Sequence, residues 1–321
     1  MTTVITGAAG FIGSQLSLRL LSKKKKVIGI DNLNNYYSVR LKKYRLKKLE
    51  KFKNFTFIRA DLSKSRSLEY FLKGKKVSDI CHLAAQAGVR YSLINPEIYL
   101  KSNIDGFLSI LEYCKKNRNT KLVYASSSSV YGGNTKVPFS TNDDVSNPVS
   151  LYAATKRANE LMAQSYSNLF RLSLIGLRFF TVYGPWGRPD MAIWNFTESI
   201  LNNQAIKVFN KGNMSRDFTY IDDIVNGIER ALEYNNKRKN YKHLLFNLGN
   251  NYPIELKNMI STLEGIIGKK AKKIMMPMQL GDVKKTYADI DESKKLLGYL
   301  PNIKIEEGLL NFVNWYKNYT K

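Results

Sequence analysis

Histidine and cysteine are scarce in this chain, whose 321 residues include two of each. Two histidines are too few ligands for a histidine-based zinc or iron site, and two cysteines in apolar patterns do not indicate a disulfide scaffold. The sequence also lacks a run of about 18 apolar residues and a basic, apolar leader. We therefore predict no metal site, no membrane partner and a cytoplasmic location.

Acidic residues are the minority among the charged side chains. Asp and Glu number 26 against 51 Lys and Arg, which gives a formal charge of +25. Such a charge makes nucleic acid a candidate partner. The lysines, however, occur in short runs at the ends or outer faces of predicted helices, at residues 23–26, 42–48, 115–116 and 269–273. We interpret these runs as solvated surface and predict no nucleic-acid partner.

Apolar strand patterns alternate with amphipathic helix patterns in the first half of the chain. Strands are predicted at residues 4–6, 27–30, 55–59, 79–83, 121–125 and 174–178, and helices up to residue 21 and at 39–51, 96–117 and 151–170. This alternation predicts an α/β fold with a doubly wound, parallel Rossmann sheet. After residue 178 the rhythm loosens, with helices expected at 191–201, 222–233 and 305–316. We expect this half to form a smaller mixed α/β domain packed against the sheet.

The stretch VITGAAGFIG joins the first strand to the first helix and spaces Gly7, Gly10 and Gly13 three residues apart. Glycines there permit a sharp turn and close approach of a pyrophosphate to the helix N-terminus. Asp31 ends the second strand, eighteen residues after Gly13, where a carboxylate binds a ribose and repels a 2′-phosphate. NAD is therefore predicted rather than NADP. Asp61, after the third strand, suits either the adenine edge or a helix N-terminus.

The stretch LYAATK places Tyr152 and Lys156 four residues apart, on one face of a predicted helix. A phenol titrates near pH ~10, and a lysine cation beside it, together with an oxidised nicotinamide, favours the phenolate that a general base requires. In YASSSSVYGG, Ser126 and Ser127 follow a strand at the carboxyl end of the predicted sheet, where α/β sites lie. We predict that the Ser127 hydroxyl bridges the substrate and the phenol.

Eight stretches, in order along the chain, carry a family resemblance. They are TGAAGFIGS, GIDNLNNYY, HLAAQAGVRYS, YASSSSVYG, PVSLYAATK, LRFFTVYGPWGRPDMA, RDFTYIDDI and GDVKKTYAD. Through them the chain resembles the extended short-chain dehydrogenase/reductase superfamily and, over nearly its whole length, the bacterial and plant UDP-glucuronate 4-epimerases. The resemblance implies tightly held NAD, a UDP-sugar substrate and a homodimer formed through two helices that flank the sheet. It also implies that residues 1–178, with later segments returning, bind NAD, and that residues 179–321 mainly bind the UDP-sugar.

Motifs and resemblance together give the candidate site. The residues expected to be catalytic are Ser127, Tyr152 and Lys156. Those expected at the cofactor are Gly7, Gly10, Phe11, Ile12, Gly13, Asp31, Asn32, Asp61, Leu62, Leu83, Ala84, Ala85, Gln86, Ser126, Tyr152 and Lys156. Those expected at the substrate are Arg90, Ser127, Ser128, Thr181, Arg188, Phe209, Arg216, Gln279 and Asp282. The resemblance implies that Arg216 binds the diphosphate, Phe209 lies near the uracil, and Asp282 and Gln279 bind the uridine ribose.

Several residues choose among related reactions. Ser128 and Ser129 stand where water-eliminating relatives carry an Asp-Glu pair and where decarboxylating relatives carry a glutamate, so both reactions are disfavoured. Relatives that act on galactose-type sugars carry Asn at the position of Thr181. Arg188, in a loop that also contains Pro185 and Pro189, offers a planar guanidinium that suits a carboxylate, and Thr181 offers a second donor. A uronic acid is therefore the favoured substrate.

A 4-keto uronate is a β-keto acid, which loses CO2 when the bond to its carboxylate aligns with the carbonyl π system. Holding the carboxylate out of that alignment would protect the intermediate, and we expect Arg188 to do so. One alternative is a 4-epimerase of UDP-N-acetylglucosamine, UDP-glucose or a related sugar nucleotide. A second, prompted by the charge, is a non-catalytic Rossmann protein that binds RNA or senses NAD. The intact set of Ser127, Tyr152 and Lys156 argues against the second.

Overall fold

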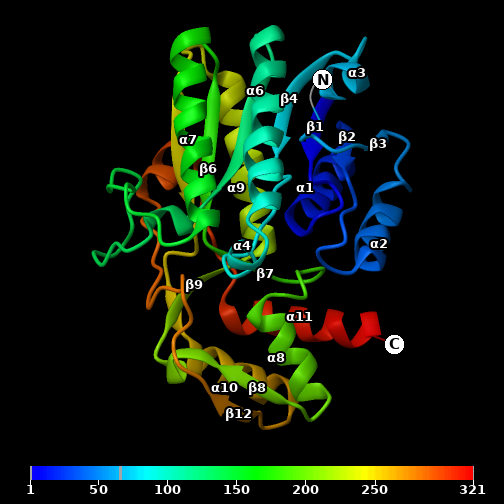
Figure 1. Ribbon diagram of the computed structural model, residues 1–321. Helices are drawn as coiled ribbons and strands as arrows, with labels where there is room; N and C mark the ends of the chain where they lie inside the picture. The colour runs from blue at the N-terminus through cyan, green and yellow to red at the C-terminus, as the bar shows by residue number, and fades with distance from the viewer. Residues whose placement is uncertain (1, 65–66, 321) are drawn as a thin grey trace.

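A seven-stranded parallel sheet forms the centre of the molecule in the computed structural model, which describes residues 2–64 and 67–320 (Figure 1). The strand order is β10-β6-β5-β4-β1-β2-β3. The strands are β1 (Thr2–Thr6), β2 (Lys26–Asp31), β3 (Phe55–Arg59), β4 (Val77–His82), β5 (Lys121–Ser127), β6 (Leu174–Phe179) and β10 (His243–Leu248). The order reverses at β1, which places a topological switch point between β1 and β4.

Helices cover both faces of this sheet. They are α1 (Phe11–Ser22), α2 (Val39–Leu49), α3 (Ser67–Leu72), α6 (Gly106–Lys116), α7 (Leu151–Phe170) and α9 (Ile221–Lys237). Alternate strand residues enter two separate cores: Ile5 and Val123 pack in one, and Val4 and Leu122 pack in the other. Figure 1 shows α6 and α7 in front of the sheet and α9 behind it. Both faces of the sheet are therefore packed against helices, as expected of parallel strands.

A smaller set of elements lies below the carboxyl ends of the strands in Figure 1. A three-stranded sheet contains β7 (Thr181–Tyr183), β9 (Ser215–Tyr220) and β11 (Pro253–Glu255), and a parallel pair contains β8 (Ala205–Val208) and β12 (Lys272–Met275). The helices of this region are α4 (Tyr91–Ile94), α8 (Ala192–Leu201), α10 (Leu256–Ile267) and α11 (Ile305–Thr320). These elements close the space onto which the main strands open.

The predicted fold class is confirmed, and the bounds of β3 and α7 match the predicted ones. The helix expected at residues 96–117 is present as one continuous run over residues 97–116, in which the π-helical segment η1 (Leu100–Asp105) lies between α5 (Glu97–Tyr99) and α6. Since β10 pairs with β6, a late segment returns to the sheet. In the described part of the chain, no helix is long and apolar enough to cross a membrane.

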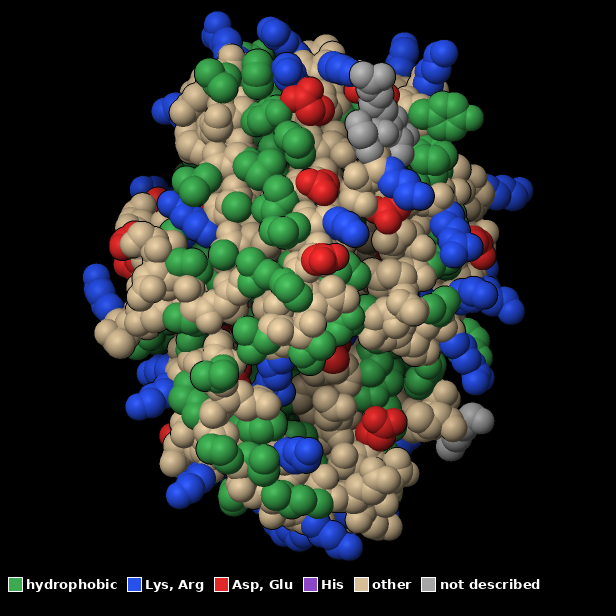
Figure 2. All heavy atoms as spheres, viewed as in Figure 1, with side chains coloured by type: hydrophobic (Ala, Val, Ile, Leu, Met, Phe, Trp, Pro, Cys, Tyr) green, Lys and Arg blue, Asp and Glu red, His purple; other side chains and the backbone are tan. Residues whose placement is uncertain are grey.

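The basic run at residues 42–48 is not all solvated surface, so that interpretation was wrong for two of its residues. Lys42 is 4% exposed and Arg45 is 2% exposed, because both lie on the face of α2 that packs inward with Leu41, Leu46 and Leu49. Elsewhere in this view, Lys and Arg side chains lie mainly around the periphery, while apolar side chains gather over α6 and α7 (Figure 2). Helical position, not charge, decides which basic residues are buried.

A buried ion pair joins α7 to β6 beneath the carboxyl end of the sheet. The Arg178 guanidinium donates from Nε to Glu160 Oε1 at 2.8 Å and from Nη2 to Oε2 at 2.9 Å. Ser126 Oγ donates to the same Oε1 at 2.6 Å. Burial by itself raises the pKa of Glu160, but the hydrogen bonds and the charge of Arg178 lower it by more. The net pKa is therefore below its ordinary value, and the carboxyl stays ionised. This pair fixes β5, β6 and α7 relative to one another.

Replacing Glu160 with Gln should lower the free energy of unfolding by about 3–5 kcal/mol, because it leaves the buried Arg178 charge without a partner. Chemical denaturation measures the loss. Glu112→Gln is the control, since Glu112 pairs with Lys115 on a half-exposed surface and should cost at most about 1 kcal/mol. Equal losses in the two variants would contradict the importance of the buried pair.

Candidate active site

A cleft of about 1070 Å³ opens at the carboxyl ends of the main strands. Every residue predicted at the cofactor, at the substrate or in catalysis lines it, except Gln279. The backbone carbonyl of Gln279 accepts a hydrogen bond from the Asp282 amide at 3.3 Å. Its side-chain Oε1 is buried and has no hydrogen-bond partner among the described residues. The sequence motifs therefore converge on one cavity, with Gln279 beside it.

The glycine loop between β1 and α1 forms one wall of the cleft. Gly7 has a φ of +69°, and a Cβ there would lie 2.8 Å from the Ala84 amide nitrogen. A Cβ on Gly13 would lie 2.1 Å from the Gly7 carbonyl oxygen, so α1 packs against the loop at a distance that only glycine permits. No side chain caps the N-terminus of α1. The amide groups there suit a phosphate, as predicted.

The side chains of Asp31 and Lys42 both line the cleft near the end of β2. Asp31 accepts hydrogen bonds from the Ala9 amide at 3.0 Å and the Leu33 amide at 2.8 Å, which fix its carboxylate at the cleft. Lys42 also lines the cleft, and its Nζ donates to the Asn34 carbonyl at 2.7 Å. Burial lowers the pKa of Lys42 to about 8, while Asp31 acts in the opposite direction. Sequence reasoning missed Lys42 because the surrounding lysines suggested a surface run.

The π-helical segment η1 holds the loop that follows β4. Asn103 Oδ1 accepts from the Gln86 amide at 2.8 Å, and Asn103 Nδ2 donates to the Gln86 carbonyl at 3.1 Å and to Thr155 Oγ1 at 3.0 Å. One side chain thus ties this loop to α7. The Thr6 hydroxyl accepts from the Leu83 and Ala84 amides, which fixes the start of the same loop against β1.

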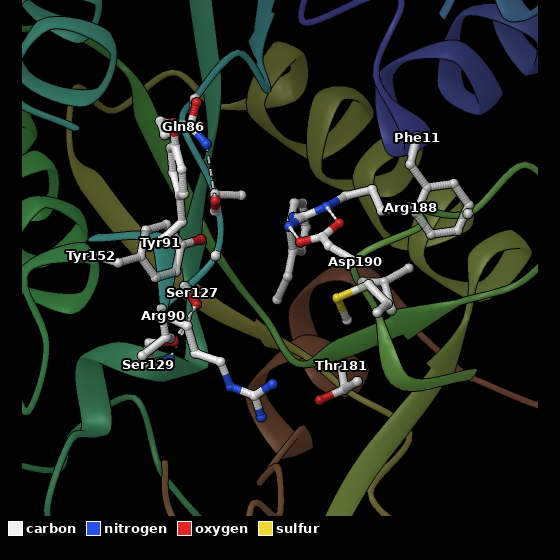
Figure 3. Close-up of a pocket in the computed structure, with 18 of the residues that line it drawn as sticks. Phe11, Gln86, Arg90, Tyr91, Ser127, Ser129, Tyr152, Thr181, Arg188 and Asp190 are labelled. Atoms are coloured by element: carbon white, nitrogen blue, oxygen red, sulfur yellow. Dashed lines mark hydrogen bonds and ion pairs between the residues drawn. The ribbon is translucent and has the colours of Figure 1, made fainter. Parts of the chain in front are cut away.

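The serine run and α7 bring the predicted catalytic groups together. Ser127 is the last residue of β5, and its Oγ accepts from the Ser129 amide at 3.2 Å. Tyr152 and Lys156 both line the cleft from α7, where Lys156 Nζ donates to the Ala125 carbonyl at 2.9 Å. Ser126 also lines the cleft, but its hydroxyl donates to Glu160 in the core. Figure 3 shows Ser127 and Tyr152 on the same side of the cleft.

Two groups oppose the effect of burial on the Tyr152 phenol. Burial raises the pKa of Tyr152 above its ordinary value, while the Ser127 side chain and the positive charge of Arg188 act in the opposite direction. Burial also lowers the pKa of Lys156 to about 8, and Glu160 partly restores it. The hydroxyl of Ser127 and the charge of Arg188 therefore favour the phenolate, which is the basic form.

Arg188 lies across the cleft from Tyr152, on the opposite side in Figure 3. Its Nε donates to Asp190 Oδ1 at 3.0 Å and its Nη2 donates to Asp190 Oδ2. Tyr36 Oη donates to the same Oδ2 at 3.0 Å. One edge of the guanidinium, which we expected to bind a substrate carboxylate, thus binds a carboxylate of the protein. Within residues 2–64 and 67–320, Nη1 makes no hydrogen bond, so it is free to donate.

Two arginines meet one carboxylate at the other end of the cleft. Arg90 Nη2 lies 3.2 Å from Asp282 Oδ2, and Arg216 Nη2 lies 4.0 Å from Asp282 Oδ1. The Arg90 guanidinium lies 4.7 Å from the centre of the Phe209 ring. A pair of cations beside an aromatic ring suits a nucleoside diphosphate. Thr181 on β7 lies below Arg188 in Figure 3, on the side of the cleft opposite Ser127.

A family model described as the NAD dependent epimerase/dehydratase family matches residues 3–249. The chain belongs to this family. It is 45% identical over 334 residues to UDP-glucuronate 4-epimerase 2 of Arabidopsis thaliana. This alignment covers 100% of this chain and 77% of the Arabidopsis chain. It is 54% identical over 315 residues to an uncharacterized protein of Methanocaldococcus jannaschii, covering 98% and 95% of the two chains. The structure of UDP-glucuronic acid 4-epimerase from Bacillus cereus, in complex with UDP-glucuronic acid and NAD, matches with a TM-score of 0.92 at 35% identity, covering 99% of this chain and 100% of that one.

Besides Lys42, the cleft of this epimerase-family chain contains further residues that were absent from the predicted site, among them Tyr36, Ser129 and Asp190. Asp190 stands two residues after Arg188, a spacing that allows a local ion pair and could have indicated it. Ser129 was used only to choose among related reactions, yet its Oγ accepts from Ser127 Oγ at 3.1 Å. Tyr36 carried no local signal, because its partner Asp190 is distant in sequence.

Changing Ser127 to Ala should lower kcat/KM at neutral pH roughly 10- to 100-fold, because the phenolate loses a hydrogen bond. Since Ser127 lowers the pKa of Tyr152, its removal raises that pKa, so the rise of kcat/KM with pH should move to higher pH. A pH–rate profile measures the shift. Ser127→Thr keeps a hydroxyl and should retain the original profile. An Ala variant whose profile is unshifted would contradict the assignment.

Proposed function

We propose that this family member is a 4-epimerase that interconverts UDP-glucuronate and UDP-galacturonate through a 4-keto intermediate. The observation that carries the proposal is the placement of Arg188 and Thr181 across the cleft from Tyr152 and Ser127 (Figure 3). A hydroxyl and a phenol suit oxidation at a sugar carbon, and a facing cation suits a carboxylate on the same sugar. The names of the Arabidopsis and Bacillus relatives support this choice of substrate.

The cofactor wall fits NAD. Gly7 and Gly13 leave room that a Cβ would fill, α1 offers its uncapped amide groups, and the Asp31 carboxylate stands where a ribose would bind. NAD, when bound, accepts a hydride from the sugar C4 and returns it. We propose that Tyr152 Oη takes the proton of the sugar O4, that Ser127 orients this hydroxyl, and that Lys156 favours the phenolate and holds the nicotinamide ribose.

The carboxylate side of the cleft would protect the intermediate. Arg188 is held rigidly, since Asp190 binds its Nε and Nη2, and its remaining Nη1 can meet a substrate carboxylate. The Thr181 and Ser128 hydroxyls line the same cleft and can donate further hydrogen bonds. When the carboxylate is held in this way, the bond between C5 and the carboxylate stays out of alignment with the π system of the C4 ketone. Decarboxylation would then be slow relative to return of the hydride.

The two regions of the chain would divide the binding. We propose that residues 1–178, together with α9 and β10, hold NAD, and that residues 179–321 mainly hold the UDP-sugar. Arg90 and Arg216 would bind its diphosphate, Phe209 its uracil, and Asp282 and Gln279 its ribose. No nucleic-acid partner forms part of this proposal. An anionic substrate gives the basic residues of the cleft a role without one.

The proposed function is tested by incubating the purified protein separately with UDP-glucuronate, UDP-glucose and UDP-N-acetylglucosamine. Proton NMR of the products should show conversion of UDP-glucuronate to UDP-galacturonate. Arg188→Ala should lower this turnover roughly 10- to 100-fold, as loss of a charge-assisted hydrogen bond predicts, or release UDP-4-keto-pentose. The two neutral sugar nucleotides should be converted poorly, because they lack the carboxylate that Arg188 binds.

Arg40→Ala is the control for Arg188→Ala, because Arg40 lies on the exposed side of α2 and bonds only to Tyr44 in the described chain. It should leave turnover unchanged. Conversion of the neutral sugars alone would overturn the proposed substrate. Unchanged kinetics with a clean product in Arg188→Ala would overturn the role of this residue.

The face formed by η1, α6 and α7 supports a homodimer. Its exposed apolar side chains are Leu100, Leu108, Leu161 and Leu169, the last of them 70% exposed. Figure 2 shows apolar side chains gathered over these helices, with charged groups around them. Apolar surface of this kind typically marks a site of association. We propose that two copies pack through this face.

The double change Leu108→Glu and Leu161→Glu should convert the dimer to a monomer, because it would bury two unpaired carboxylates in each copy of the interface. Size-exclusion chromatography with light scattering measures the mass. Leu310→Glu changes an exposed leucine on α11 and should leave the dimer intact. A wild-type protein with the mass of one chain would refute the dimer itself.

A further inference from the structure

Arg45 on α2 is a buried cation that joins two loops of the cleft. Its Nε and Nη2 donate to the Trp186 carbonyl at 3.1 and 2.6 Å, and its Nη2 also donates to the Gly187 carbonyl at 2.8 Å. Its Nη1 donates to the Ala9 carbonyl at 3.0 Å and to Tyr37 Oη at 2.7 Å. These five bonds end on backbone carbonyls and a phenol. The guanidinium thus acts as a link between main-chain segments.

One end of this link is the glycine loop. Ala9 lies between Gly7 and Gly10, and its amide donates to Asp31 Oδ2 at 3.0 Å while its carbonyl accepts from Arg45. Both polar groups of Ala9 are therefore fixed, one by the acid at the ribose position and the other by α2. A displacement of Arg45 would free the Ala9 carbonyl, while the bond from the Ala9 amide to Asp31 would keep the loop at the cofactor wall.

The other end is the loop that carries Arg188. Trp186 has a φ of +64°, a left-handed backbone conformation that an L-residue keeps only when its surroundings hold it. Its ring centre lies 4.0 Å from Lys48 Nζ and 5.2 Å from the ring centre of Trp315 on α11. Arg45 holds the carbonyls of residues 186 and 187, directly before Arg188. The direction of the Arg188 side chain therefore depends on these bonds.

We propose that Arg45 is a positioning residue that sets the distance between the carboxylate-binding loop and the cofactor loop. The inference rests on the proposed function, because it concerns how the sugar carboxylate is placed relative to the cofactor. Arg45 acts through the main chain of residues 9, 186 and 187 and not by contact with the substrate. A lysine presents its donors from one nitrogen and cannot reach these carbonyls together, whereas a guanidinium can.

The test compares wild type, Arg45→Lys, Arg188→Ala and the double variant with UDP-glucuronate as substrate. Arg45→Lys should retain NAD and lower kcat roughly 10- to 100-fold, because a small misplacement of a positioning group costs a factor of this size. It should also release UDP-4-keto-pentose. In the Arg188→Ala background the same change should lower kcat by less than about twofold, since residues that act through one another are not additive.

Arg40→Lys, the same substitution on the exposed side of α2, is the control and should behave as wild type. Arg45→Gln is made in parallel, because it introduces no buried charge and keeps the measurement available if the lysine variant does not fold. Fully additive losses of Arg45 and Arg188 would overturn the inference, as would a clean product at the wild-type rate. The inference would also be overturned if an Arg45 variant lost NAD and regained full activity when NAD was added.

The two proposals fail in different ways. If wild type does not turn over UDP-glucuronate, the proposed function is wrong. If wild type epimerises UDP-glucuronate and the losses of Arg45 and Arg188 are additive, only the positioning role is wrong. Amide hydrogen exchange over residues 184–190 adds a direct readout: it should be faster in the folded Arg45 variants than in Arg40→Lys, and equal rates would overturn the role.

Discussion

The close contact between α1 and the Gly7 carbonyl is the constraint on which the rest of the site depends. It exists only because Gly13 has no side chain, since a Cβ there would lie 2.1 Å from that oxygen. The contact places the N-terminus of α1 at the cleft and leaves its amides available. Through Ala9 it also sets the position of Arg45 and hence of the loop before Arg188. A wider contact at Gly13 would displace both walls.

Local patterns predicted the parts of the molecule that local patterns determine. The bounds of β3 and α7 agree with the apolar periodicity, and the motif residues converge on one cleft because strand ends meet at one edge of a parallel sheet. Local patterns did not indicate the pairing of β10 with β6, since it joins segments about 70 residues apart by packing and not by propensity; only the resemblance implied that later segments return. The π-helical segment η1 likewise had no local signal, since Asn103 within it bonds to Gln86 and Thr155, which are distant in sequence.

Charge was the least reliable guide to burial. Lys42 and Arg45 occupy apolar positions of the α2 pattern, but the lysines around them suggested a solvated run. Their burial is possible because carbonyl oxygens and the Tyr37 ring, 4.5 Å from Lys42 Nζ, receive their charges. Arg188 is a second example. Its guanidinium suits a substrate carboxylate, but it also suits the carboxylate of Asp190, two residues further along the chain.

The alternation of side chains along β5 has a consequence for how this chain can vary. Ser126 and Ser127 both line the cleft, yet the Ser126 hydroxyl binds Glu160 in the core, whereas the Ser127 hydroxyl bonds to Ser129 at the cleft. Because successive strand residues point to opposite faces, a single inserted or deleted residue in β5 would exchange their surroundings. The hydroxyl that binds Glu160 in the core would then be misplaced, and the cleft would lose the Ser127 hydroxyl. Length changes during evolution should therefore be confined to the loops and absent from this strand, whatever substitutions it tolerates.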